Sequence, residues 1–421
     1  MDQYLYGIDF GTTNSVLSIY DERKNEIIET ISIPSLLYFP YDQDSELPIQ
    51  YFVGNLAISS YLSDGMRGRF MKSIKRVLSS TSFIETRIHN QNFTASDLVS
   101  LIIKELKNKA DKIIDFDCRK AVIGRPVFFD NESNHKDELA QKRLNIAVKK
   151  AGFENVKYQF EPIGAAFAYE KTIAKSERVL VADFGGGTTD FTYVILDPEH
   201  AGKKDRRSDI IASGGLYIGG DSFDSAFMWE KGTPNFGKGV EYQSDPGKFL
   251  ALPASLFTNI CSWEKMNFFN GYKIQNELKR YYAFTGQNAS FKNLITLTEN
   301  NLGYSVFQAI EKTKIDLSDL SESVFCYSNM EIEINETISI DEYNRIIEKD
   351  LKKIDLYADE FLKKNNIEGS EIDTLYLTGG TSLVVAINKL FRNKFPNAAI
   401  NSNDNFISVA KGLAYSGYLF E

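Results

Sequence analysis

The sequence predicts an α/β protein built from two similar lobes that face each other. One observation is a strand, turn and strand pattern near the N-terminus that returns in the middle of the chain. Another is the alternation of strand-like and helix-like segments between the two copies. The chain has 421 residues, of which 43% are hydrophobic, so it is too long for one ordinary core and has the material for two.

The composition excludes several classes of protein. The formal net charge of -9 disfavours general nucleic-acid binding, because an acidic surface repels phosphate backbones. No segment is apolar enough over a sufficient length to span a bilayer, and Met1–Tyr4 lacks the basic start of a secretion signal. We therefore expect a cytoplasmic monomer. The widely spaced Cys118, Cys261 and Cys326 predict buried, reduced thiols and no zinc site.

The first copy of the repeated pattern has a strand at Tyr4–Phe10, a tight turn, and a second strand at Val16–Tyr20. The second copy runs from Arg178 to Leu196, and its turn covers Asp183–Asp190. Each turn contains Asp-Phe-Gly and a Thr-Thr pair, and the flanking residues are mostly β-branched or aromatic, as in strands. The separation of the copies is too long for a solenoid repeat. It indicates two similar halves.

Between the two copies we expect α/β alternation. Tyr41–Ser63 is less regular, and the helix over Phe93–Ile114 begins at a capping box formed by Thr94 and Asp97. The other expected elements are strands at Ile27–Pro34 and Ala121–Pro126, a helix over Glu132–Ala151 that ends at Gly152, and a helix over Ile163–Ala174.

After Asp197 the pattern is weaker. Residues 230–248 are predicted to be irregular, and residues 250–335 mostly helical. Thr374–Thr381 is a strand leading into a turn, Val384–Phe395 and Val409–Tyr418 are helices, and 401–404 is a loop. The predicted domains are a first lobe at 1–175, with an inserted subdomain at about 36–115, and a second lobe at 176–421, with one at about 225–335.

The two Asp-Phe-Gly turns have the chemistry of a phosphate and metal site. Backbone N–H groups in a glycine-rich turn form a concave site for phosphate oxygens. A carboxylate beside the phosphates attracts magnesium, which keeps several of its water ligands. Asp9 and Asp183 would then hold the ion largely through water. Plain hairpin turns also favour Gly, Asp and Thr, so one turn is weak evidence and two matching turns are stronger.

Another glycine-rich segment, Gly232–Gly239, nearly matches the P-loop pattern. Its last position is Gly239, so the metal-binding hydroxyl is missing, and no strand precedes it. We interpret this segment as an ordinary loop.

In their order along the chain, these motifs resemble the nucleotide-binding domain of the DnaK-like heat shock protein 70 family. That family belongs to the actin-like ATPase superfamily, whose two ribonuclease-H-like lobes enclose a nucleotide cleft. The resemblance is nearest to short YegD-type homologues without a substrate-binding domain. The matching segments are Gly7–Ser15, Val122–Pro126, Phe160–Tyr169, Val181–Asp190, Ile218–Asp224 and Leu377–Ser382.

The resemblance implies roles for individual residues. Asp9 and Asp183 resemble the magnesium-site aspartates, and Glu161 and Asp190 the residues around the attacking water. Lys75 resembles the lysine that orients water and γ-phosphate, with Lys72 as the rival candidate. The nucleotide-binding positions implied are Gly11, Thr12, Thr13, Asn14, Gly185, Gly186, Gly187, Thr188, Gly219, Gly220, Asp221, Glu311, Lys314, Ser318, Gly379, Gly380 and Thr381.

The sequence also departs from the family. Ile315 and Leu383 stand where arginines are usual, so cation–π contact with adenine is lost. The chain ends at Glu421, and we expect no peptide-binding domain. The implied function is slow, magnesium-dependent ATP hydrolysis that switches the conformation for a client or co-chaperone. A sugar-type kinase is the main alternative, and a filament protein and an inactive ATP-binding homologue are also considered.

Overall fold

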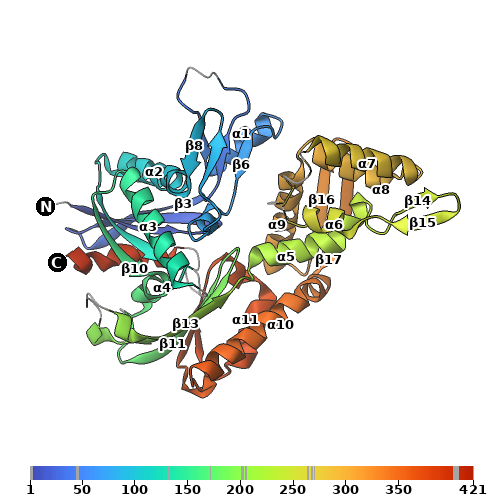
Figure 1. Ribbon diagram of the computed structural model, residues 1–421. Helices are drawn as coiled ribbons and strands as arrows, with labels where there is room; N and C mark the ends of the chain where they lie inside the picture. Colours follow the sequence, from blue (N-terminus) through green and yellow to red (C-terminus); the bar gives the residue numbers. More distant parts are fainter. Residues whose placement is uncertain are drawn as a thin grey trace.

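The computed structural model describes residues 3–43, 47–129, 133–170, 172–200, 203, 206–262, 265–266, 269, 271–401 and 407–420 (Figure 1). This part of the chain is mixed α/β and is built on two five-stranded sheets, each the base of one lobe. The predicted fold class is confirmed. The residue limits given above for the lobes and their inserted subdomains stay predictions.

The two sheets have the same strand order and the same directions. The first has the order β3-β2-β1-β9-β10 and the second β13-β12-β11-β18-β19. In each, the first three strands are antiparallel and the last three parallel. The first sheet comprises β1 (Tyr4–Phe10), β2 (Asn14–Asp21), β3 (Glu26–Pro34), β9 (Lys120–Arg125) and β10 (Asn155–Phe160). The second comprises β11 (Glu177–Phe184), β12 (Thr189–Leu196), β13 (Ile210–Leu216), β18 (Thr374–Thr378) and β19 (Ala399–Asn401).

This match gives the two Asp-Phe-Gly turns equivalent positions. The first turn joins β1 to β2 and the second joins β11 to β12, so each follows the central strand of its sheet. The internal repeat read from the sequence is therefore a structural repeat.

Long helices cover the sheets. The first sheet carries α2 (Ala95–Ile114) and α3 (Asn134–Lys150), and the second carries α10 (Ile340–Lys364) and α11 (Val385–Lys394). The predicted capping box is present, because Thr94 Oγ1 accepts from Asp97 N while Asp97 Oδ2 accepts from Thr94 N. Among the helices of the described residues, none has the length and apolar character needed to cross a membrane.

Two short helices cross where the lobes meet. These are α4 (Glu161–Glu170) and α12 (Ser408–Ala414), which pack on each other. A Cβ at Gly412 would lie 1.9 Å from the carbonyl oxygen of Gly164, and a Cβ at Gly7 would lie 2.2 Å from Ala414 N. Only glycine allows such backbone contact. The lobes are thus joined at a tightly packed crossing.

Each lobe carries further elements. The first has β4 (Leu37–Phe39), β5 (Phe52–Val53), α1 (Asn55–Ser63), β6 (Arg69–Met71), a 3-10 helix at Ile74–Val77, β7 (Glu85–Ile88) and β8 (Gln91–Thr94). The second has α5 (Gly220–Phe227), β14 (Glu241–Asp245), β15 (Lys248–Ala251), α6 (Ala254–Ile260), α7 (Tyr272–Phe284), α8 (Ala289–Glu299), α9 (Gly303–Asp319), β16 (Glu322–Asn329) and β17 (Ile332–Ser339).

Several sequence predictions in these added regions were wrong. Tyr41–Ser63 contains the helix α1, which buries only Ala57 and Tyr61 and has no side-chain cap, so it gives no helical signal. The segment at 230–248, predicted to be irregular, contains β14. The prediction that residues 250–335 are mostly helical is confirmed by α6, α7, α8 and α9, although β16 and the start of β17 also lie there. Cys326 is exposed, because alternation along β16 turns it outward. Cys118 and Cys261 are buried, and all three thiols are free.

The near-P-loop segment Gly232–Gly239, predicted to be an ordinary loop, instead contains a 3-10 turn at Thr233–Phe236 and follows a π turn at Met228–Gly232. Positions 402–404 of the predicted loop lie outside the described residues.

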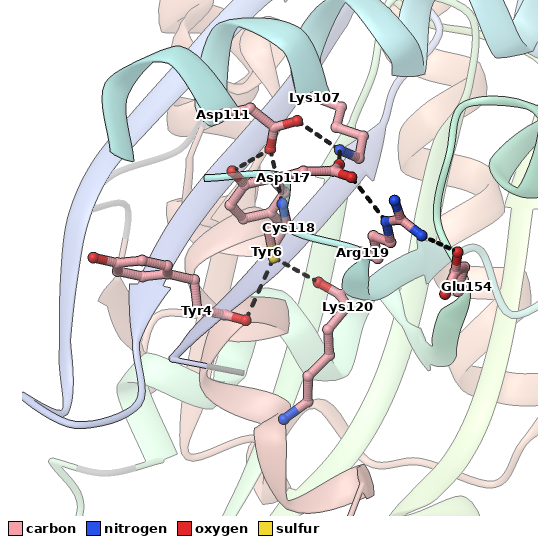
Figure 2. Close-up of polar contacts among 9 residues, drawn as sticks. All are labelled: Tyr4, Tyr6, Lys107, Asp111, Asp117, Cys118, Arg119, Lys120 and Glu154. Carbon is pink, nitrogen blue, oxygen red and sulfur yellow. Dashed lines mark hydrogen bonds and ion pairs between the residues drawn. The ribbon is translucent and has the colours of Figure 1, made fainter. Parts of the chain in front are cut away.

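A charged cluster beside the starts of β9 and β10 fixes α2 to β1 (Figure 2). Lys107 Nζ donates to Asp111 Oδ2 at 2.5 Å and also to Asp117. Tyr6 Oη donates to Asp111 Oδ1 at 2.8 Å. We call this the Lys107 cluster, and its members are Tyr6, Lys107, Asp111, Asp117, Arg119 and Glu154.

Candidate functional site

A cavity of about 1140 Å³ lies between the two lobes. Both Asp-Phe-Gly turns line it, together with the starts of α4 and α5, one side of α9 and the turn after β18. Of the predicted catalytic and nucleotide-binding residues, all except Gly187 and Gly219 are in its lining. Residues far apart in the sequence are thus brought to one cleft.

The two turns touch each other across the cleft. A Cβ at Gly186, in the second turn, would lie 2.1 Å from Thr13 Oγ1 in the first. This hydroxyl is buried and has no hydrogen-bond partner among the described residues. A buried polar atom without a partner costs about 1–3 kcal/mol. A ligand that accepts or donates at this point would recover that cost.

The start of α5 fixes the backbone of the second turn. Gly220 N donates to Gly185 O at 3.1 Å, and Asp221 N donates to Gly186 O at 2.7 Å. A Cβ at Gly219 would lie 2.6 Å from the same two carbonyl oxygens. Gly219 therefore supports the turn from behind. Gly187 is covered in a different way, because a Cβ there would lie 2.2 Å from Arg76 Nη2.

The floor of the cleft carries four carboxylates, and we call them and Lys75 the cleft cluster. Burial raises the pKa of Asp9 to about 7, and Glu161 raises it further while Lys75 opposes the rise. Burial and then Asp190 raise the pKa of Asp183 to about 8. Burial also raises the pKa of Asp190 to about 6, against the hydrogen bond that it accepts from Thr188 at 2.9 Å. Asp9, Asp183 and Asp190 are therefore hard to ionise together.

Lys75 is the cation that faces these carboxylates. Its Nζ donates to Glu161 Oε1 at 2.8 Å. Burial lowers the pKa of Lys75, but Glu161 and Asp9 overcome that effect and leave it raised. The rival lysine points elsewhere: Lys72 Nζ lies 3.3 Å from Asp221 Oδ1.

The excess negative charge fits a divalent cation. One ammonium does not balance Asp9, Glu161, Asp183 and Asp190, and a bound cation would favour their ionised forms. In the described part of the chain, no three His, Cys, Asp or Glu side chains are grouped closely enough to ligate a metal directly. Asp9 and Asp183 offer carboxylate oxygens, which are ligands of the kind that magnesium takes while it keeps much of its water.

The other end of the cleft is more apolar. Ile315 and Leu383 line it with exposed fractions of 58% and 46%, so both present apolar surface to the cleft. Ser318 and Glu311 lie on the same wall, in α9. Lys314 also lines it, but its Nζ is held by Asp224 Oδ1 at 2.7 Å.

Sequence reasoning missed some residues of this lining. Arg76, Asp224, Asn388 and Arg392 all belong to it. Arg76 directly follows Lys75, and Asp224 closes the Ile218–Asp224 segment, so their neighbours in the sequence were a signal for both. Asn388 and Arg392 are one helical turn apart on α11, a spacing that places them on one face but gives no signal of its own.

A scan against protein-family models matches the Hsp70 protein family over residues 66–240 and 271–420. The chain belongs to the Hsp70 family. The match covers most of the chain, including the second Asp-Phe-Gly turn and the segments that carry Lys75, Glu161 and α9.

Curated relatives agree with this family. The chain is 24% identical over 429 residues to the chaperone protein DnaK of Mycoplasmopsis pulmonis, which covers 99% of this chain and 58% of the relative. It is 32% identical over 234 residues to DnaK of Thermosipho africanus, covering 54% and 35%. It is 28% identical over 237 residues to an HscA homologue of Rickettsia prowazekii, covering 53% and 36%. At most, then, this Hsp70-family chain spans about three fifths of these relatives' length.

Proposed function

We propose that this chain binds ATP with magnesium in the cleft and hydrolyses it slowly. The observation that carries the proposal is the meeting of two Asp-Phe-Gly turns, one from each lobe, at a single cavity, with Thr13 against Gly186. Membership of the Hsp70 family supports nucleotide binding.

The phosphates are held by the two turns. Their backbone N–H groups and the hydroxyls of Thr12 and Thr13 supply donors for phosphate oxygens, while the Thr188 hydroxyl donates to Asp190. Asp9 and Asp183 would hold a magnesium ion, largely through its water ligands, and that ion would supply positive charge beside the transferred phosphoryl group. Thr13 gains the partner that its buried hydroxyl lacks within the protein.

Hydrolysis uses the cleft cluster. Glu161 and Asp190 accept hydrogen bonds from a water molecule and orient its oxygen toward the γ-phosphorus. As the new P–O bond forms and the bond to the leaving ADP oxygen breaks, a carboxylate takes the water proton. Lys75 stabilises the negative charge of the transition state from its position beside Glu161.

The base lies at the apolar end. Ile315 and Leu383 pack on its two faces, and Ser318 offers a hydroxyl at its edge. Apolar packing discriminates poorly between bases. We therefore expect weaker selectivity for adenine than an arginine-lined pocket would give.

The output is a change in the separation of the lobes. Two lobes that grip one triphosphate move when the terminal phosphate is lost. Relatives of this chain are chaperone proteins, and we propose that the change is passed to a client or co-chaperone.

The test is phosphate release by the purified protein with Mg-ATP, alone and with a panel of sugars. We expect slow hydrolysis that does not depend on an acceptor. ADP formation that requires a sugar would instead support the kinase alternative. Asp183→Ala should abolish Mg-ATP binding or turnover, and hydrolysis at the wild-type rate in that variant would remove the site assignment.

A further inference from the structure

An arginine outside the cleft holds the segment that carries Lys75. Residues 73–83 follow β6, and we call them the Lys75 segment. The guanidinium of Arg143, on α3, donates to four carbonyl oxygens of this segment at 2.7–3.0 Å, those of Val77, Leu78, Ser80 and Phe83. The first three oxygens share the two hydrogens of Nη1, and the fourth accepts from Nη2.

The backbone of the Lys75 segment depends on support from outside. Ile74 and Leu78 are buried in the core and fix one side of it. Its first residue, Ser73, has a φ of 56°, a left-handed conformation that costs free energy and persists only where the surroundings hold it. The single 3-10 turn that follows, Ile74–Val77, is weakly stabilised by its own hydrogen bonds, and the last carbonyl groups of a helix have no partners within it. Arg143 supplies those partners.

Arg143 is suited to this task. Burial lowers its pKa, and no carboxylate of the described residues raises it, so its N–H groups serve the backbone of the segment. Arginine presents five N–H groups in a rigid fork, which can reach several carbonyl oxygens at once, as the single ammonium of lysine cannot. The backbone at Arg143 is itself anchored, because Ser96 Oγ of α2 donates to Arg143 O at 2.9 Å. The segment is thus tied to both helices that cover the first sheet.

The other side of the Lys75 segment faces the cleft. Three of its side chains line the cavity, those of Lys75, Arg76 and Ser79, while Arg143 is not part of the lining. Lys75 Nζ lies 2.8 Å from Glu161 Oε1, so a backbone shift of about 1 Å would take the ammonium out of hydrogen-bond reach. The carbonyl groups that Arg143 binds begin two residues after Lys75, which makes their position decisive for this side chain.

We propose that Arg143 is a positioning residue for ATP hydrolysis, whose hydrogen bonds to the carbonyl groups of the Lys75 segment hold the Lys75 ammonium in place in the cleft. This role rests on the proposed function. Arg143 acts through the backbone and touches neither nucleotide nor metal. Since the two Asp-Phe-Gly turns hold the phosphates without it, loss of Arg143 should lower kcat and leave KM nearly unchanged.

Hydrogen exchange in the nucleotide-free protein tests whether Arg143 holds the segment. Arg143→Met should speed exchange of the backbone amides of Arg76 and Leu78 about tenfold, because local opening no longer breaks the bonds to the guanidinium. The matched control is Lys107→Met, which removes another cation of the first lobe and should leave these two amides at the wild-type rate. Exchange at the wild-type rate in Arg143→Met would overturn the proposal.

A double-mutant cycle with Lys75 separates positioning from a general loss of stability. In Arg143→Met, kcat per folded molecule should fall about 3- to 10-fold with KM within about twofold of the wild type, and Lys107→Met should keep the wild-type kcat. In the Lys75→Met background, Arg143→Met should cause no further fall, because both changes act through one ammonium. A fall of the same size in that background would show that Arg143 does not act through Lys75.

The two measurements also separate this role from the proposed function. Faster exchange with an unchanged kcat would overturn the positioning role and leave the proposed function intact. A wild-type protein that does not hydrolyse ATP would overturn the proposed function and the role in catalysis with it, while the exchange rates would still decide whether Arg143 holds the segment. Arg143→Lys keeps the charge on one nitrogen, should show both changes at smaller size, and replaces the methionine variant if that variant does not fold.

Discussion

Two charged clusters of this protein use the same residue types in opposite ways. In the Lys107 cluster, Lys107 and Arg119 are hydrogen-bonded to Asp111, Asp117 and Glu154, so each carboxylate has a cationic partner (Figure 2). In the cleft cluster, four carboxylates meet Lys75, which forms an ion pair with Glu161.

The difference appears in the pKa of the aspartates. Lys107 and then Arg119 lower the pKa of Asp117, whereas burial and Asp190 raise the pKa of Asp183 to about 8. The first cluster is satisfied by the protein and contributes to stability. In the second cluster the protein alone does not stabilise the charged forms of the aspartates, as is common at sites that bind a charged ligand.

The largest effect on stability is expected from Lys107→Met. Lys107 is 4% exposed, and its removal leaves Asp111, whose side chain is 20% exposed, without its cation. The free energy of unfolding should fall by about 1–3 kcal/mol, measured by urea denaturation. ATP turnover per folded molecule should not change, because the cluster lies outside the cleft lining. A loss of turnover per folded molecule would contradict the claim that the Lys107 cluster serves stability alone.

Asp183→Asn should change stability and ATP hydrolysis in opposite directions. Removal of a carboxylate that is costly to ionise should raise the free energy of unfolding of the nucleotide-free protein by about 1–3 kcal/mol. ATP hydrolysis should fall by about 100-fold or more. Thermal unfolding and phosphate release on the same sample check both. If Asp183→Asn is less stable than the wild type and fully active, the contrast between the two clusters is wrong.

Lys75→Met tests the cation of the cleft. We expect kcat to fall by about 10- to 100-fold with little change in KM, because the ammonium acts mainly on transition-state charge. Lys72→Met, whose lysine lies against Asp221, should reduce kcat less. An equal or larger loss in Lys72→Met would assign the role to the rival lysine.

The smallest effect is expected on stability at low pH. A carboxyl whose pKa is lowered on folding contributes stability above its unfolded pKa of about 3.9, and this is lost as pH falls through the folded pKa. Asp117 is such a group. Wild-type protein should therefore lose slightly more stability than Lys107→Met between about pH 4 and pH 2, in urea denaturation at matched salt. Parallel pH curves for the two proteins would argue against this coupling.

Much of the central fold was predictable because its signals are local. The strands around Asp9 and Asp183 are continuous apolar runs ended by glycine, and the capping box at Thr94 marks a helix start within four residues. The added regions were harder. In α1, Tyr61 is buried by contact with Phe70 and Tyr304, and nothing near Tyr61 in the sequence indicates that partner.

Most residues that line the cleft were predictable from the motifs, but their arrangement in space was not. The motifs identified Lys72 and Lys75 as rivals, and only the tertiary structure separates them, since one lies at Glu161 and the other at Asp221. Arg76 was missed for the same reason, because its contact with Gly187 joins segments that are over 100 positions apart.

The central claim is that Asp9 and Asp183 serve one magnesium ion and one triphosphate. Its most direct test is the magnesium dependence of ATP affinity, measured by calorimetry for the wild type, Asp9→Asn, Asp183→Asn and the double variant. If both carboxylates hold the same ion, each single variant should lose most of that dependence and the double variant little more, because coupled residues are not additive. The account would be contradicted if the losses of magnesium dependence were additive, or if ATP binding by the wild type did not depend on magnesium.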